Sequence, residues 1–428
     1  MTGGVMYSSR ALRVVRWGRH TCHCLDAAAQ LHTRQFAPKK ALILTKFSRY
    51  EFEKKRHGNI PEAELEKRLK ERGSDYNMLL YHHYLHKGCE NTVVQALRNQ
   101  NIDTKVVTRF DYKSDVIEES DIVFTMGGDG TFLLGATRIL HPNKPIVGIN
   151  SDPTRSEGHL LLPKRYSVNI KEAVQRLLAG KFRWLFRKRI RMTLIGQDVY
   201  KPPVELHNQQ LLNPEYRYLD MDWSNASLPT SYMESSTMVE PRGITYAKQA
   251  RVLPVLALNE VFIAECLSAR VSYYEMSIDG GPQFKQKSSG LCVSTGTGST
   301  SWTYNINKLT PQVVSQLMNA LKHETGLELD SKDEALVGRV TDRVNQVLIF
   351  GPEENRMCYT IRDPVMSAPR SAAEKRPRGL ARRLEVRSRC FDANLVVDGG
   401  LSFPFNDGTV AILDIHDDDA LRTVVLDD

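Results

Sequence analysis

A glycine-rich turn at residues 127–131 constrains the fold of this chain more than any other segment. It has the sequence Gly-Gly-Asp-Gly-Thr and lies between an apolar run at 121–126 and a segment of helical apolar spacing at 132–140. A strand, such a turn and a helix together present backbone N–H groups and a positive helix end to a phosphate. The turn also holds the carboxylate of Asp129. A carboxylate is expected in an anion-binding site only if it has a chemical role, such as accepting a proton or positioning a hydroxyl.

Strand and helix patterns alternate through the first part of the chain. Strand patterns at 41–45, 103–108, 122–126 and 145–150 are separated by helical ones, and a further helix is predicted at 167–180. This alternation predicts a parallel sheet with helices on its faces. Ligands of such sheets bind at the carboxyl ends of the strands, which is where the glycine-rich turn lies.

Beyond about residue 166 the strand patterns mostly follow one another without helices between them. They cover 187–195, 257–265, 270–278, 291–294, 383–389, 395–398 and 409–414. The predicted fold class is therefore α/β, with an N-terminal parallel α/β nucleotide-binding domain and a C-terminal all-β, sandwich-like domain. A polar insert at 199–249 interrupts the second domain, as does a basic, Pro-containing segment at 366–382 that we predict to be a mobile surface loop.

The positive charge of the chain is concentrated at its N-terminus. Residues 1–40 contain seven of the 58 Lys and Arg residues but only one of the 50 acidic residues, Asp26. Such a composition is typical of a mitochondrial transit peptide, which we predict over 1–38, and a disordered basic tail is the alternative. The remainder is nearly neutral, which argues against a nucleic-acid partner. No apolar run is long enough to span a bilayer, so we expect no membrane partner.

Cysteine and histidine usage predicts neither a disulfide framework nor a metal centre. The seven cysteines are odd in number and irregularly spaced, which fits a reducing compartment such as the mitochondrial matrix. His82 and His86 are one helical turn apart, but no third metal ligand is evident, so a packing or surface role is favoured.

A second glycine-rich segment, at 294–302, follows the strand pattern that ends at 294. It reads Ser-Thr-Gly-Thr-Gly-Ser-Thr-Ser-Trp and offers hydroxyl donors and an aromatic face. Two phosphate-friendly turns, one in each predicted domain, indicate a cleft that holds a nucleotide. Asn259 and Glu260 lie within an apolar strand, so alternation turns one of them toward the buried side or the cleft. Taken singly, each feature also has a plain structural interpretation, as a turn, a Ser/Thr-rich loop or a strand-end pair.

Together with Val-Asp-Gly-Gly at 397–400, these segments resemble the NAD kinase family in order and spacing. The resemblance covers nearly the whole chain after the predicted transit peptide. Segments 46–53, 150–160 and 286–290 are similar to the mitochondrial members of that family in animals.

The resemblance implies both a domain organisation and an activity. An α/β domain is expected over 39–165, joined by the C-terminal end at about 415–428, with a β-rich NAD-binding domain over 166–414. The implied activity is ATP-dependent phosphorylation of the 2′-hydroxyl of the NAD adenosine ribose to give NADP. It uses Mg²⁺ or another divalent cation, in a homodimer of the mitochondrial matrix.

The resemblance also implies roles for individual residues. Asp129 is the expected catalytic base, Asn259 and Glu260 contact NAD, and segment 298–302 packs on the adenine. No metal ligands are indicated. The residues expected to bind ATP or NAD are Gly127, Gly128, Gly130, Thr131, Phe132, Asn150, Asn259, Glu260, Ser289, Thr297, Gly298, Ser299, Thr300, Ser301 and Trp302.

The chain departs from the family pattern at two of these positions. Ser289 stands where an NAD-contacting Asp is usual, and Trp302 replaces a Tyr, which keeps a stacking face but loses a hydroxyl. One alternative is a lipid kinase of the diacylglycerol or sphingosine type, because such kinases share the Gly-Gly-Asp-Gly-Thr turn. A second is a non-catalytic nucleotide sensor, if Ser289 marks lost chemistry.

Overall fold

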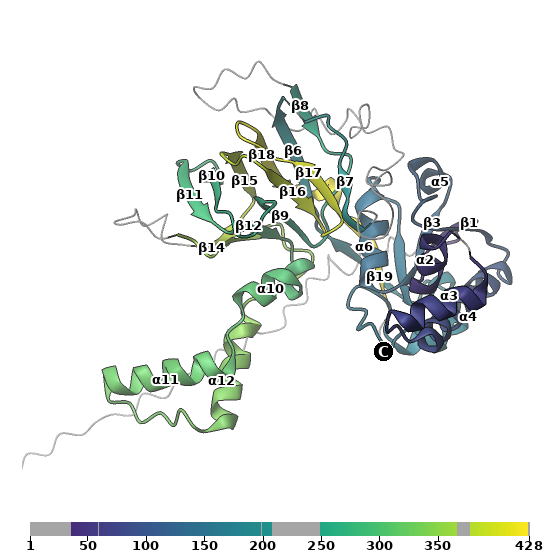
Figure 1. The fold of residues 1–428 in the computed structure, drawn as a ribbon, viewed down its shortest axis with the longest axis horizontal. Helices are drawn as coiled ribbons and strands as arrows, with labels where there is room; N and C mark the ends of the chain where they lie inside the picture. The colour runs from purple at the N-terminus through teal and green to yellow at the C-terminus, as the bar shows by residue number, and fades with distance from the viewer. Residues whose placement is uncertain (1–35, 59, 198, 208–248, 366–376, 427–428) are drawn as a thin grey trace, which may run out of the picture.

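The computed structural model shows a parallel sheet with helices beside a pair of antiparallel sheets (Figure 1). The predicted transit peptide, apart from its last residues, and most of the polar insert lie outside the described residues. The structure describes residues 36–58, 60–197, 199–207, 249–365 and 377–426.

The N-terminal sheet has six strands in the order β2-β1-β3-β4-β19-β5. All neighbouring pairs are parallel except the last, in which β5 runs antiparallel to β19. The strands are β1 (Lys40–Thr45), β2 (Asp103–Val107), β3 (Ile122–Gly127), β4 (Ile146–Asn150), β5 (Arg183–Arg187) and β19 (Leu421–Val425). The last strand of the chain thus pairs inside the N-terminal sheet.

Helices cover both faces of this sheet because its central strands are apolar on both sides. On one face, α4 (Tyr76–Arg98) and α8 (Ile170–Leu178) pack against side chains such as Ile43 and Phe124. On the other, α6 (Asp129–Arg138) packs against Leu44. The remaining helices of this part are α2 (Arg49–Arg56), α3 (Glu62–Glu71), α5 (Ser114–Glu118) and α7 (Arg165–Val168).

The C-terminal region is a sandwich of two antiparallel sheets, which confirms the predicted fold class. Alternate residues of each sheet, such as Val386 in one and Ile263 in the other, meet in a shared apolar core. One sheet contains β6 (Ile190–Gly196), β8 (Gln249–Val252), β10 (Ser272–Ile278), β11 (Phe284–Ser288), β15 (Arg383–Ser388) and β18 (Val410–Ile415). The other contains β7 (Val204–Glu205), β9 (Glu260–Glu265), β12 (Gly290–Ser294), β13 (Met357–Arg362), β14 (Arg378–Ala381), β16 (Ala393–Val397) and β17 (Leu401–Pro404).

Two details differ from the sequence-based expectation. The end of the predicted loop at 366–382 forms β14, because its backbone pairs with β13 at the edge of the sheet. A helical hairpin of α11 (Pro311–Thr325) and α12 (Glu334–Gln346) interrupts the strands and projects from the sandwich beyond α10 (Trp302–Asn307) (Figure 1). None of the helices in the described segments is long and apolar enough to cross a bilayer.

Candidate active site

The first glycine-rich turn joins β3 to α6, which begins at Asp129. Gly128 is the N-cap residue and supplies no side-chain cap, so the first N–H groups of the helix are available to an anion. A Cβ on Gly127 would lie 2.3 Å from the Oγ1 of Thr131, whereas one on Gly130 would meet nothing within 4 Å. Packing therefore requires glycine at position 127. At position 130, the absence of a side chain leaves open space beside the N-terminal end of α6.

The carboxylate of Asp129 is held by the loop that follows β4. One oxygen accepts the N–H of His159 at 3.1 Å, and the other accepts that of Leu160 at 2.9 Å. Asn150 orders this loop, since its Nδ2 donates to the carbonyl of Ser156 and its Oδ1 accepts the N–H of Asp152. The side chain of Asn150 is therefore engaged within the loop and acts on Asp129 through it.

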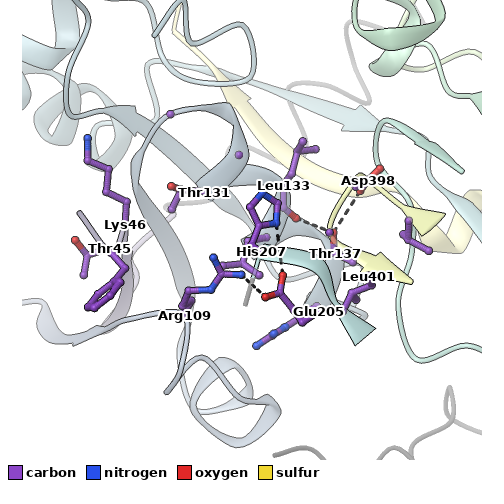
Figure 2. A pocket seen from close by; sticks show the side chains of 18 residues that line it. Thr45, Lys46, Arg109, Thr131, Leu133, Thr137, Glu205, His207, Asp398 and Leu401 are labelled. Atoms are coloured by element: carbon purple, nitrogen blue, oxygen red, sulfur yellow. Dashed lines mark hydrogen bonds and ion pairs between the residues drawn. The ribbon is translucent and has the colours of Figure 1, made fainter. Parts of the chain in front are cut away.

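A cavity of about 490 Å³ lies beside the first turn, between the N-terminal sheet and the sandwich (Figure 2). Its volume is within the usual range for a small-molecule site. Arg109, from the segment after β2, forms an ion pair with Glu205 of β7 at 2.6 Å and closes one side. Lys46 lines another side, and burial lowers the pKa of its ammonium group.

The second glycine-rich turn packs directly on the start of β9. A Cβ on Gly298 would lie 2.2 Å from the carbonyl oxygen of Asn259, so only glycine permits this approach. The Nδ2 of Asn259 donates to the Oγ of Ser301 at 3.2 Å. The ring of Trp302 stands 4.4 Å from that of Phe262 and is 39% exposed, so it keeps a free face for stacking.

Two buried carboxyl groups, Glu260 and Asp398, meet where the sandwich contacts α6. Asp398 accepts the N–H groups of Leu258, Asn259 and Glu260 and also the hydroxyl of Thr137. Burial raises the pKa of Asp398 to about 6. Burial, with a smaller contribution from the charge of Asp398, raises the pKa of Glu260 to about 8.

Polar atoms of Asn259 and Glu260 remain open to a ligand. The Oδ1 of Asn259 and the Oε2 of Glu260 are buried and have no hydrogen-bond partner within the described chain. Because buried polar atoms are normally paired, these two mark the position at which a bound molecule would supply partners.

Three of the expected binding residues present no side chain to this cleft. The side chain of Phe132 is buried in the apolar core between α6 and the N-terminal sheet, and it does not line the cavity of about 490 Å³. The Oγ of Ser299 donates to the carbonyl of Gly296 inside the second turn. Ser289 precedes β12, at the opposite end from the turn, and its Oγ donates to the carboxylate of Asp363 at 2.6 Å.

The sequence reasoning missed two charged residues of this region. Asp398 lies in the Val-Asp-Gly-Gly segment, so a signal was present, but the buried contacts that it makes were not foreseen. Arg187 gave no signal, because it is one of several basic residues at the end of β5 and only the fold places it beside Thr297.

The histidines of α4 serve packing. His82 contacts the Asp152 carboxylate at 2.9 Å, and the buried His86 contacts the hydroxyl of Thr45. Within the described part of the chain, no group of three or more His, Cys, Asp or Glu side chains is placed to hold a metal ion.

Comparison with curated proteins gives relatives over almost the full length. The chain is 42% identical to "NAD kinase 2, mitochondrial" of Homo sapiens over 395 residues, which covers 92% of this chain and 85% of the relative. It is 41% identical to the Xenopus tropicalis protein of the same name over 411 residues, 92% of each chain. No family model matches the chain.

Solved structures of two kinases also align with most of this chain. An NAD kinase from Archaeoglobus fulgidus in complex with ATP aligns over 91% of this chain and 93% of its own, with a TM-score of 0.45 and 15% identity. Yeast NADH kinase complexed with NADH aligns over 91% and 84%, with a TM-score of 0.47 and 14% identity.

Proposed function

Because this chain belongs to the NAD kinase family, we propose that it is a mitochondrial NAD kinase that uses ATP to phosphorylate the 2′-hydroxyl of the NAD adenosine ribose. The observation that carries this proposal is the identity of 42% over 92% of the chain. The geometry supports it, because an acid stands at a helix N-terminus beside a cavity of nucleotide size.

Asp129 acts as the base in the proposed reaction. Each of its oxygens accepts one backbone N–H and keeps a lone pair that can accept the ribose proton. As the bond from O2′ to the γ-phosphorus forms, the bond from that phosphorus to the oxygen of ADP breaks, and the proton passes to Asp129. The first N–H groups of α6, near Gly130 and Thr131, would bind the ATP phosphates.

The NAD side of the site is formed by β9 and the second turn. Asn259 and Glu260 have the unpaired buried oxygens, and the segment 297–302 adds hydroxyls and the Trp302 ring. Since the pKa of Glu260 is about 8, its carboxyl is protonated at neutral pH and can donate a hydrogen bond to NAD.

A divalent cation fits this site only with few protein ligands. Mg²⁺ would be held mainly by the ATP phosphates, because it usually keeps several waters and takes one or two carboxylates plus substrate phosphates. When bound, the cation would neutralise phosphate charge.

The proposal also covers the location of the protein in the cell and its oligomeric state. The basic, nearly acid-free composition of residues 1–38 supports a transit peptide, and the names of the relatives support a mitochondrial protein. We place the mature protein in the matrix as a homodimer, on the resemblance alone.

The test is phosphorylation by the full chain with ATP and Mg²⁺, offered NAD, diacylglycerol or sphingosine. We expect NADP from NAD and no lipid product. Asp129→Asn should lose about 10²–10⁴-fold in turnover, because it removes the general base, and keep the melting temperature. Lipid phosphorylation without NADP would establish a lipid kinase, and NAD binding without turnover would establish a sensor. Wild-type rates in Asp129→Asn would refute the role of the base.

A further inference from the structure

Arg187 occupies a position between the two glycine-rich turns. It is the last residue of β5, at the edge of the N-terminal sheet, and its Nη1 donates to the Oγ1 of Thr297 at 3.3 Å. The carboxylate of Asp129 is close enough for its charge to act on the guanidinium. Arg187 also lines a small cavity of about 210 Å³ together with Leu160, whose N–H binds Asp129. One cation therefore contacts the second turn and lies within electrostatic range of Asp129.

The charge of Arg187 is not fully compensated by the groups that surround it. Burial lowers the pKa of its guanidinium to about 10, although the charge of Asp129 opposes this shift. The Nε is buried and has no hydrogen-bond partner among the described residues. Its hydrogen-bond acceptor Thr297 is a neutral hydroxyl. Since a buried charge is costly unless it is paired and hydrogen-bonded, the site favours an additional anion.

We propose that Arg187 binds the phosphoryl group as it passes from ATP to the ribose 2′-oxygen, and then the 2′-phosphate of the product. This inference rests on the proposed kinase function. The reaction is the one given above: phosphorus exchanges its bond to ADP for a bond to O2′, and the proton goes to Asp129. Negative charge spreads over the oxygens of the transferred group, and the planar guanidinium fork matches such oxygens.

A purely structural role predicts a different outcome. The hydrogen bond to Thr297 connects the N-terminal sheet to the sandwich, so Arg187 could simply hold the two layers together. Loss of such a connection would lower stability and weaken NAD and NADP alike. Loss of a phosphate ligand would instead discriminate between NADP and NAD, which differ only in the 2′-phosphate.

The experiment uses Arg187→Met, Arg187→Lys and a matched control, Arg422→Met, in the full chain. Arg422 lies on the neighbouring strand β19, where its guanidinium stacks on Trp184 and Phe186, and it takes no part in the site. We expect Arg187→Met to lower kcat about 10²–10³-fold at saturating ATP and NAD, with Arg187→Lys between it and the wild type. Arg422→Met should retain wild-type kinetics.

Equilibrium binding without ATP supplies the second readout. Arg187→Met should weaken NADP at least tenfold and leave the Kd for NAD unchanged. An unchanged kcat, or equal weakening of NAD and NADP, would overturn the role of Arg187. If the wild type forms no NADP, the proposed function fails, while the ratio of NADP to NAD affinity still decides whether Arg187 binds the 2′-phosphate.

Discussion

At the scale of single residues, the pair Glu260 and Asp398 shows how burial sets the chemistry of the site. Asp398 has a left-handed backbone, with a φ of 47°, and this turn directs its carboxylate at the N–H groups that begin β9. Those bonds partly compensate its burial, whereas the Oε2 of Glu260 has no such partner in the described chain. Glu260 is therefore the group that remains protonated.

This difference predicts how stability depends on pH. Glu260 titrates near its ordinary 4.5 in the unfolded chain and near 8 in the folded one. Between these values the folded state keeps a proton that the unfolded state releases, so the free energy of unfolding falls as pH rises, by at most about 1.4 kcal/mol per pH unit. Glu260→Gln cannot ionise and should lose this dependence. Urea unfolding at about pH 6.5 to 8 measures it, and parallel curves for the two proteins would contradict the assignment.

At the scale of elements, Gly298 in the second turn and Gly130 in the first are needed for different reasons. In the second turn, Gly298 lies against the backbone of Asn259, which cannot move without displacing β9. In the first, Gly130 belongs to the opening turn of α6 and faces open space at the cavity. One glycine serves packing, and the other is positioned for a close approach by a ligand.

Alanine substitutions should separate these two reasons. Gly298→Ala should lower the free energy of unfolding by about 1–3 kcal/mol, because its methyl overlaps backbone atoms. Gly130→Ala should leave stability equal or slightly higher, by up to about 1 kcal/mol, because alanine favours a helix. Its KM for ATP should rise, since the methyl occupies space beside the helix N–H groups. Equal effects of the two substitutions on stability would contradict this distinction; thermal unfolding and initial rates provide the comparison.

At the scale of the whole molecule, two buried arginines at the start of β6, one just before the strand and one within it, join the sandwich to the N-terminal layer. The Nη1 of Arg189 donates to the carbonyls of Ala136 and Ile139 at the C-terminal end of α6. Arg191 forms a two-point ion pair with Asp419, at 2.7 and 2.9 Å, just before β19. The start of β6 thus holds both α6, which carries the proposed base Asp129, and the segment that returns the chain to the first sheet.

Removing the ion pair between Arg191 and Asp419 should destabilise the protein without altering the chemistry of the site. Arg191→Met leaves Asp419 buried without its bidentate partner and should cost about 3–5 kcal/mol of unfolding free energy. The double variant Arg191→Met/Asp419→Leu should recover most of that loss, because neither charge of the buried pair remains. Chemical denaturation gives both values. If the double variant is no more stable than Arg191→Met, the loss does not come from the unpaired charge of Asp419, and this explanation is wrong.

The local pattern of residues was sufficient for the elements that depend on neighbours in sequence. Short apolar runs predicted the central strands of the N-terminal sheet, and the helical spacing at 132–140 predicted α6, which begins three residues earlier, at Asp129. The hairpin of α11 and α12 was missed although signals were present, since Thr310 caps α11 and Gly326 ends it. Strand β14 was missed because an edge strand depends on its partner.

Which distant residues meet depends on the three-dimensional packing of the chain. Local sequence was enough for the two turns, the acid within the first turn and the pattern of the sheets, because backbone period and glycine chemistry are local. The contacts of Thr137 with Asp398, and of Arg187 with Thr297, join residues more than 100 positions apart. Such pairs form only when the N-terminal domain packs against the sandwich, and burial in the folded protein raises the pKa of Glu260. The local residue pattern does not indicate which distant residues become neighbours or how deeply each side chain is buried.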